Sequence, residues 1–442
     1  MAPEVDKGSL VAAEKKKLKR ELTIIPLFAL IYFTVCGGAF GAEPMVGLSG
    51  PGLALLLMVI TPLVFSIPNM LMVREMQSMM PVEGGYYHWV KQAFGPFAGF
   101  MSGWMNWVVS WVDVSIYPVW MAWYLSYFIP ALNDGATIGG VEVSSDLLSW
   151  LVAAILIIAV SFLNMRGAKL TGLTASWLGV AMIIPIIIMS GFGIYAWIVN
   201  GTPTDIPFLP GGAEVNGRNL LGALSVGIYV AMWNFMGWEL PTAAGDEIKN
   251  PKKTYPRAMV LVLIAAILSY SIPTMAGLYG GAGTDGQYLA CGIEEYDTGE
   301  GIGPILNEYG IEDEKMLTWG IDPGSDAGWE FPTIAHRIGD AVAGKDSPLS
   351  FFLGAIVGIS AIFSMIGLFI GNGLGGTRVP FAMAEDGMMP TWLTKVHPKY
   401  GTPWVAILIC GFFYLIFSTS AFQNLVVIDV FLNMLVLMAE IF

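Results

Sequence analysis

Five carboxylates lie within long apolar stretches of this sequence, where a charge is energetically costly. They are Glu43, Asp113, Glu239, Asp429 and Glu440. Ionisable side chains at membrane depth are functional by default, and a carboxyl group in apolar surroundings is either protonated or matched by a cation. No Lys or Arg accompanies these residues within the same stretches. The pattern indicates a site for protons or for ammonium groups.

Two of these stretches contain residues that interrupt a helix. The first carries "GGAFG" (residues 37–41) just before Glu43, and the other carries Gly237 and Pro241 in "WNFMGWELP". Glycine frees the backbone and proline removes a hydrogen-bond donor. Unwound backbone at membrane depth is tolerated only where it is buried in protein or lines a cavity. Matching breaks are typical of a transporter's binding site, although a glycine patch also serves close helix packing.

The composition indicates a membrane protein. Of the 442 residues, 55% are hydrophobic and 12% are charged, about half the charged fraction of a soluble domain. Apolar runs long enough to cross a bilayer occur about ten times, so we predict an all-α polytopic membrane protein. The predicted spans are 23–48, 52–73, 98–128, 147–164, 170–199, 219–242, 257–279, 350–373, 403–419 and 424–442.

The basic residues predict the orientation of the chain. With a cytoplasmic N-terminus, all but four of the 21 Lys and Arg residues fall in inside segments, as expected of cytoplasmic loops. The acidic residues gather in the outside segment at about 281–347. That segment is either a negative vestibule that concentrates cations or a solvated insertion. The four outside exceptions are Arg218, Lys315, Arg337 and Lys345.

At the breaks the sequence resembles the amino acid/polyamine/organocation permeases. "GGAFG" is similar to their glycine-rich first-helix motif, and "WNFMGWE" to their sixth-helix motif. The resemblance continues through residues 75–95, 247–258 and 376–390. It implies a five-plus-five inverted-repeat, leucine-transporter-like fold and secondary active transport by alternating access. The expected parts are a basic cytoplasmic tail (1–22), a first repeat (23–199) and a second repeat (219–442) that contains the acidic insertion.

The chain departs from some members of that family. Many have twelve spans, whereas this sequence stops at Phe442 as the tenth predicted span ends. Some proton-coupled relatives also place a lysine midway along the fifth span. Here Lys169 lies at the cytoplasmic end of that span instead, so their coupling group is not carried over.

The acidic residues resemble those of the polyamine-transporting branch, in which a carboxylate follows the first-helix break and an Asp precedes a Tyr-Pro pair. Aromatic side chains near the breaks supply faces for cations. The expected substrate site therefore comprises Gly37, Gly38, Ala39, Phe40, Gly41, Glu43, Asp113, Tyr117, Trp233, Gly237, Trp238 and Glu239. Of these, Glu43, Asp113 and Glu239 are the candidates for proton coupling.

The resulting hypothesis is a proton-coupled symporter of amino acids or polyamines in the plasma membrane, leaning towards cationic amines. The alternatives are a neutral amino acid permease or exchanger, and a sensor of the same fold that does not transport. Sodium, for which Ser364 and Asn372 offer oxygens, is the less favoured coupling ion. An enzyme is disfavoured because H-E-x-x-H and phosphate-loop patterns are absent. We expect no cofactor, structural metal or nucleic acid as a partner.

Overall fold

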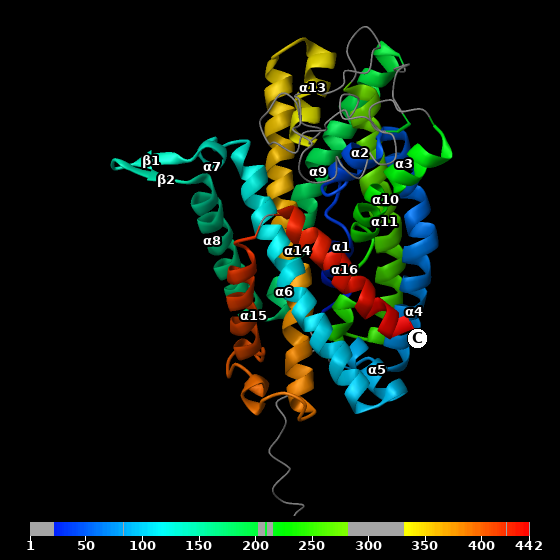
Figure 1. Ribbon diagram of the computed structural model, residues 1–442, viewed down its shortest axis with the longest axis vertical. Helices are drawn as coiled ribbons and strands as arrows, with labels where there is room; N and C mark the ends of the chain where they lie inside the picture. The colour runs from blue at the N-terminus through cyan, green and yellow to red at the C-terminus, as the bar shows by residue number, and fades with distance from the viewer. Residues whose placement is uncertain are drawn as a thin grey trace, which may run out of the picture.

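The structure, a computed structural model, is a bundle of long helices (Figure 1). It describes residues 22–441 apart from 83, 202–207, 210–214, 282–330 and 421. The α-helices are α1 (Ile24–Val35), α2 (Glu43–Ser49), α3 (Pro51–Thr61), α4 (Ile67–Met79), α5 (Tyr86–Phe94), α6 (Pro96–Ser126), α7 (Ala131–Asp134), α8 (Ser145–Met165), α9 (Ala168–Asn200), α10 (Gly217–Trp233), α11 (Pro251–Gly280), α13 (Phe331–Ala343), α14 (Pro348–Glu385), α15 (Trp404–Phe417) and α16 (Phe422–Ile441). The π-helix η1 (Pro62–Ser66) joins α3 to α4, and the 3₁₀ turns are η3 (Leu240–Ala243), η4 (Gly245–Glu247) and η6 (Thr391–Thr394).

Each predicted span contains a helix. Five helical segments in the described part are long and apolar enough to cross a membrane: Pro51–Met79, α8, α9, α11 and α14. Helices α1 and α15 are apolar but shorter, and α6, α10 and α16 occupy the remaining predicted spans. The prediction of a helical membrane protein is confirmed. Within the described residues, a small hairpin of β1 (Ala136–Ile138) and β2 (Val141–Val143) lies between α7 and α8.

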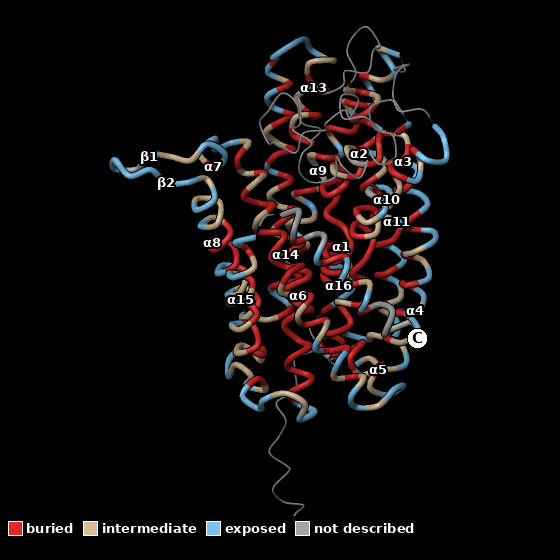
Figure 2. The backbone as a smooth tube through the Cα atoms, in the orientation of Figure 1, coloured by how far each residue is buried: buried red, intermediate tan, exposed pale blue. Residues whose placement is uncertain are grey.

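The most buried helices lie at the centre of the bundle, and the outer helices turn apolar side chains outwards. Figure 2 shows buried backbone along α1, α6 and α14, and exposed stretches on α8 and α15. Large apolar residues on the outer surface include Ile155, Trp177 and Ile198, which are 69%, 75% and 76% exposed. In water such a surface would be unfavourable. It is the surface that a bilayer covers.

The two predicted helix breaks lie against each other. Helix α1 ends at Val35 and α2 begins at Glu43, while α10 ends at Trp233. The backbones of Gly41 and Gly237 have φ angles of 99° and 93°, which favour glycine. A Cβ atom on Gly237 would lie 2.6 Å from the backbone oxygen of Thr34. Gly237 is therefore required both by its backbone conformation and by its contact with α1.

The second break does not lead directly into another α-helix. After Gly237 the chain forms the short 3₁₀ turns η3 and η4 before α11 begins. Pro241 cannot donate a backbone hydrogen bond. The end of η4 and the chain just beyond it pair with Leu22, two residues before α1 begins. The N–H of Leu22 donates to the oxygen of Glu247 at 3.0 Å, and the N–H of Lys249 donates to the oxygen of Leu22 at 2.9 Å.

The division into two repeats stays a prediction. Helix α9 ends at Asn200 and α10 begins at Gly217. The predicted tail lies outside the described residues except for Leu22. The acidic insertion also lies outside them up to residue 330, but its last part is helix α13. That helix buries Phe331, Ile334 and Ile338 and contacts α9, α11 and α14, so this part is not a solvated loop.

A buried ion pair ties α14 to the end of the second break. The Arg378 Nε donates to Glu247 Oε1 at 2.9 Å, and both side chains are almost completely buried. Arg378 Nη1 also donates to the Thr377 hydroxyl at 2.9 Å. Removing one partner of a buried pair leaves the other charge without compensation. This pair therefore holds η4 in place next to the bundle.

We expect Arg378→Ala to lower the free energy of unfolding by about 3 kcal/mol or more, because it leaves the Glu247 carboxylate buried and unpaired. The measurement is thermal unfolding in detergent. The double variant Arg378→Met/Glu247→Gln, which removes both charges, should be more stable than Arg378→Ala. Lys91→Ala is the control, since it breaks the more exposed pair with Asp386 (2.6 Å), and such pairs contribute only ~0–1 kcal/mol. Equal losses for both single variants would contradict this assignment.

Candidate functional site

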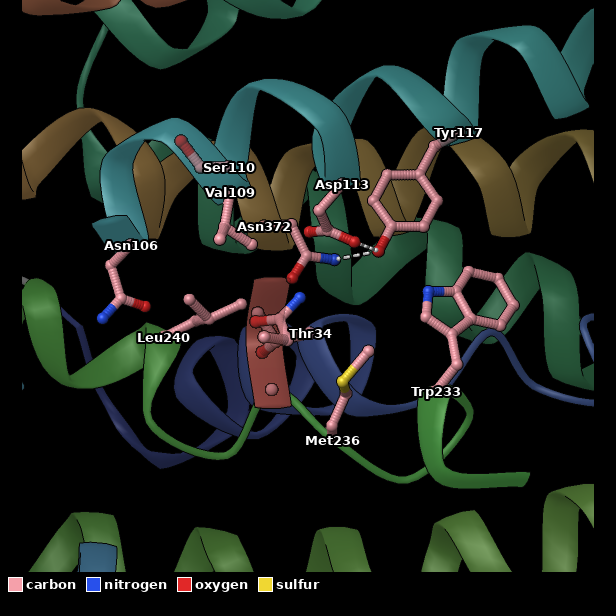
Figure 3. Close-up of a pocket in the computed structure, with 12 residues that line it drawn as sticks. Thr34, Asn106, Val109, Ser110, Asp113, Tyr117, Trp233, Met236, Leu240 and Asn372 are labelled. Carbon is pink, nitrogen blue, oxygen red and sulfur yellow. Dashed lines mark hydrogen bonds between the residues drawn. The ribbon is translucent and has the colours of Figure 1, made fainter. Parts of the chain in front are cut away.

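A small cavity lies where the two breaks meet the centre of the bundle (Figure 3). Its volume is about 30 Å³, which is room for roughly two water molecules and too little for an amino acid or an amine. A solute can therefore enter only if the surrounding helices move. The lining comes from α1, α6, the second break, α14 and α16, and consists of Thr34, Asn106, Val109, Ser110, Asp113, Tyr117, Trp233, Met236, Gly237, Leu240, Asn372 and Asn433.

Asp113 is the carboxylate that lines this cavity. It lies one helical turn before Tyr117 on α6, and the Tyr117 hydroxyl donates to Asp113 Oδ1 at 2.7 Å. The side-chain amide of Asn372, on α14, donates in turn to the Tyr117 oxygen at 3.0 Å. Figure 3 shows this chain of hydrogen bonds at one side of the cavity. It fixes the rotamer of Asp113 and leaves its second oxygen available to a solute.

Two further carboxylates lie close to Asp113. Glu239 follows the second break, is 2% exposed, and its Oε2 has no hydrogen-bond partner within the described residues. Asp429, on α16, is fully buried, and its Oδ1 accepts a bond of 2.8 Å from the Asn433 amide. Its Oδ2 likewise has no partner in the described part of the chain. Both residues lie within electrostatic range of Asp113.

This group of carboxylates, Asp113, Glu239 and Asp429, has no cationic partner among the described side chains. The ion pairs found there involve Glu247, Asp340 and Asp386 instead. A buried carboxyl group that lacks a counter-ion must hold a proton or attract a cation. The arrangement can therefore bind protons, ammonium groups, or both in alternation.

Glu43 lies apart from this cavity. Its Oε2 accepts the backbone N–H of Gly41 at 2.7 Å, and its Oε1 accepts the Tyr124 hydroxyl at 2.7 Å. The side chain is buried, with 5% exposure, so it is not hydrated at the end of a span. It does not line the cavity.

The other residues expected at the site fall into two groups. Asp113, Tyr117, Trp233 and Gly237 line the cavity. Trp238 is turned away, because its indole N–H donates to the oxygen of Phe235 at 2.9 Å. The first break serves packing: the Ser364 hydroxyl donates to the Gly37 oxygen at 2.6 Å, and Phe40 packs edge-on against Tyr124. The residues of the expected site that do not line the cavity are Gly37, Gly38, Ala39, Phe40, Gly41, Glu43, Trp238 and Glu239.

Several residues near the cavity were not expected there from the sequence. Asp429 is not among the residues of the expected substrate site, but α16 crosses the bundle obliquely (Figure 1) and carries it into the interior. Asn433 follows one turn later on the same face. Asn372 had been considered for sodium, and its amide instead bonds Tyr117. The sequence did contain a signal for this pair: in the apolar span of α16, Asp429 is followed four positions later by the amide residue Asn433, on the same helix face.

The chain matches a protein-family model described as "Amino acid permease". The match covers residues 22–286 and 339–442. It omits residues 287–338, which make up most of the acidic insertion. The ordered motifs and the family model therefore agree over nearly the whole bundle.

Curated relatives align over most of the chain. The polyamine transporter RMV1 of Arabidopsis thaliana is 30% identical over 414 residues, which is 92% of this chain and 69% of that protein. The polyamine transporter PUT1 of Oryza sativa subsp. japonica is 29% identical over 418 residues, 93% of this chain and 64% of that protein. The serine/threonine exchanger SteT of Bacillus subtilis is 25% identical over 410 residues, 89% of this chain and 75% of that protein.

Solved structures identify the fold. The crystal structure of MhsT in complex with L-phenylalanine matches with a TM-score of 0.56 at 13% identity, and the match covers 92% of this chain and 81% of that one. The architecture is thus the expected leucine-transporter-like fold, in which broken helices meet at the middle of the bundle. From its motifs, its fold and the family match, the chain belongs to the amino acid permease family of multi-pass membrane transporters.

Proposed function

We propose that the chain is a secondary active transporter that couples proton movement to the uptake of amines, favouring cationic amines such as polyamines over zwitterionic amino acids. The observation that carries this proposal is a group of three buried carboxylates that has no described cationic partner. Asp113 lines the cavity, and Glu239 and Asp429 lie within electrostatic range of Asp113. An amino acid brings its own carboxylate into such a site, where it meets like charges. A diamine brings ammonium groups alone.

The number of carboxylates also supports proton coupling. A diamine with two ammonium groups neutralises two carboxylates, and the third then needs a proton to remain buried at low cost. Trp233, which lines the cavity, supplies an aromatic face for an ammonium group. Symport follows from this arrangement if substrate and proton occupy the group together and leave together.

Alternating access is proposed because the cavity is too small for the solute and is bordered by α1 and by the second break. The end of the bundle that holds α5 carries basic residues such as Arg74, Lys91 and Lys395, and we place it in the cytoplasm of a plasma-membrane protein. The opposite end, with α2, α13 and the β1–β2 hairpin (Figure 1), then faces outwards. Exchange of neutral amino acids, as the name of SteT describes for that protein, is the competing function.

The first prediction concerns purified protein in proteoliposomes with an imposed inward proton gradient. Labelled putrescine and arginine should accumulate above the level seen without the gradient, and alanine should not, because only the cationic solutes match the carboxylates. Sodium should leave the rates unchanged. Accumulation of alanine alone would contradict the preferred substrate class, and binding without accumulation of any solute would favour a sensor.

Neutralising one carboxylate should weaken uptake strongly. Asp113→Asn removes a buried charge next to a bound ammonium group, an interaction that contributes about 2 kcal/mol or more, which is about 30-fold in affinity. Putrescine uptake at low concentration should fall by at least that factor. Glu142→Gln, the same exchange on an exposed strand residue, is the control and should transport normally. Undiminished uptake by Asp113→Asn would remove this residue from the site.

A further inference from the structure

Helix α13 lies at the same end of the bundle as α2 (Figure 1) and packs against α14, α9 and α11. Its first residue, Phe331, packs edge-on against Phe40 of the first break, with ring centroids 5.8 Å apart. From there aromatic rings continue inwards. Phe40 packs on Tyr124 (5.5 Å), Tyr124 on Trp120 (5.9 Å), and Trp120 on Trp233 (5.6 Å), which lines the cavity. This series, from Phe331 to Trp233, closes the cavity on the α13 side.

The carboxylate of Glu43 lies at the polar centre of this closure. Besides the Gly41 N–H and the Tyr124 hydroxyl, it accepts a hydrogen bond from the backbone N–H of Phe331. These donors belong to the first break, to α6 and to α13. The Phe331 N–H is at the start of α13, where the helix dipole favours a negative charge. One buried anion therefore joins three separate segments.

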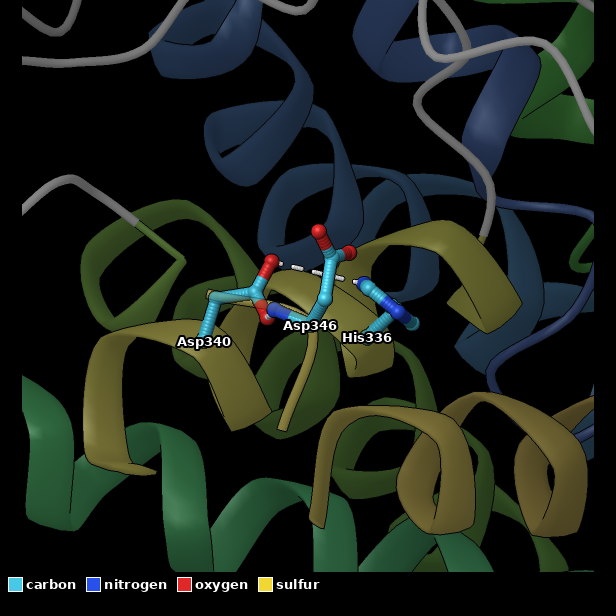
Figure 4. Close-up of side chains that lie close together, drawn as sticks. All are labelled: His336, Asp340 and Asp346. Carbon is cyan, nitrogen blue, oxygen red and sulfur yellow. Dashed lines mark hydrogen bonds and ion pairs between the residues drawn. The ribbon is translucent and has the colours of Figure 1, made fainter. Parts of the chain in front are cut away.

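The opposite end of α13 is held by a different set of contacts (Figure 4). Asp340 Oδ1 accepts the backbone N–H of Asp346 at 2.8 Å and the Ser350 hydroxyl at 2.6 Å, and Asp340 Oδ2 lies 3.4 Å from His336 Nδ1. His336, Asp340 and Asp346 are close enough together to suggest a metal site, but both Asp340 oxygens already have partners in the chain. We interpret the cluster as a joint that fixes α13 to the start of α14.

We propose that Glu43 is a latch on the α13 side: it holds α13, α6 and the first break together while the cavity is closed to that side, and α13 pivots about the Asp340 joint when the latch releases. Its role thus differs from that of the three cavity carboxylates. The proposal rests on the alternating-access part of the proposed function. It assigns Glu43 to gating and not to contact with the substrate.

The proposal predicts a change in the position of α13. Spin labels at Thr333→Cys on α13 and Val141→Cys on β2, in a Cys291→Ser background, report the distance between α13 and the hairpin by pulsed electron paramagnetic resonance. The control is the Cys291→Ser protein without the two new cysteines. It should take up no spin label, because Cys36 and Cys410 are buried. With Glu43 intact we expect one dominant distance.

Glu43→Ala removes charge-assisted hydrogen bonds, so it should raise the population with a longer distance relative to the closed one by at least about tenfold. Tyr124→Phe removes a single hydroxyl and keeps the ring series, and it should shift the populations in the same direction by less. An unchanged distance distribution in both variants would overturn the latch. Should Glu43→Ala fail to fold, Tyr124→Phe decides alone.

This measurement separates the latch from the proposed function, because it needs no substrate. A distance shift with no uptake by the unmodified protein would support the latch and contradict transport. Proton-driven putrescine uptake without a distance shift in the variants would support transport and contradict the latch.

Discussion

The architecture depends on one constraint: backbone that leaves a helix inside a membrane must find hydrogen-bond partners within the protein. The two breaks meet this constraint largely through each other and through α14. The Asn234 amide, at the end of α10, donates to the Gly41 oxygen at 2.7 Å, and Ser364 satisfies the oxygen of Gly37. Both breaks are therefore held at the same depth. The cavity and its carboxylates are located where these partners meet.

The same constraint explains why so few charges remain inside. A buried carboxylate is stabilised either by several hydrogen bonds or by a bound cation. Glu43 is of the first kind, since donors surround it on several sides. Glu239 and Asp429 are of the second kind, because each retains an oxygen without a described partner. Side chains of the same chemical type are thus separated by their surroundings into one with several hydrogen bonds and two that each retain an oxygen without a described partner.

The sequence predicted the helical class, the spans and the positions of both breaks, because these depend on local composition. It included Asp113 and Tyr117, which line the cavity, because they lie midway along a long span. It failed for Asp429, whose depth depends on how obliquely α16 packs against α6. It also failed to separate Glu43 from the cavity, because the partner at Phe331 lies within the acidic insertion, far along the chain. Rotamers such as that of Trp238 depend on tertiary contacts and were not predictable.

The pairing of Leu22 with the chain after η4 links the segment that enters the first span to the segment that leaves the second break. These two backbone hydrogen bonds and the buried Arg378–Glu247 ion pair form one connected set of contacts at the α5 end. If a path to the cavity opens from that end, either these contacts break or the segments on both sides of them move together as one rigid body. The start of α1 and the end of the second break are therefore mechanically coupled, although more than two hundred residues separate them in the sequence.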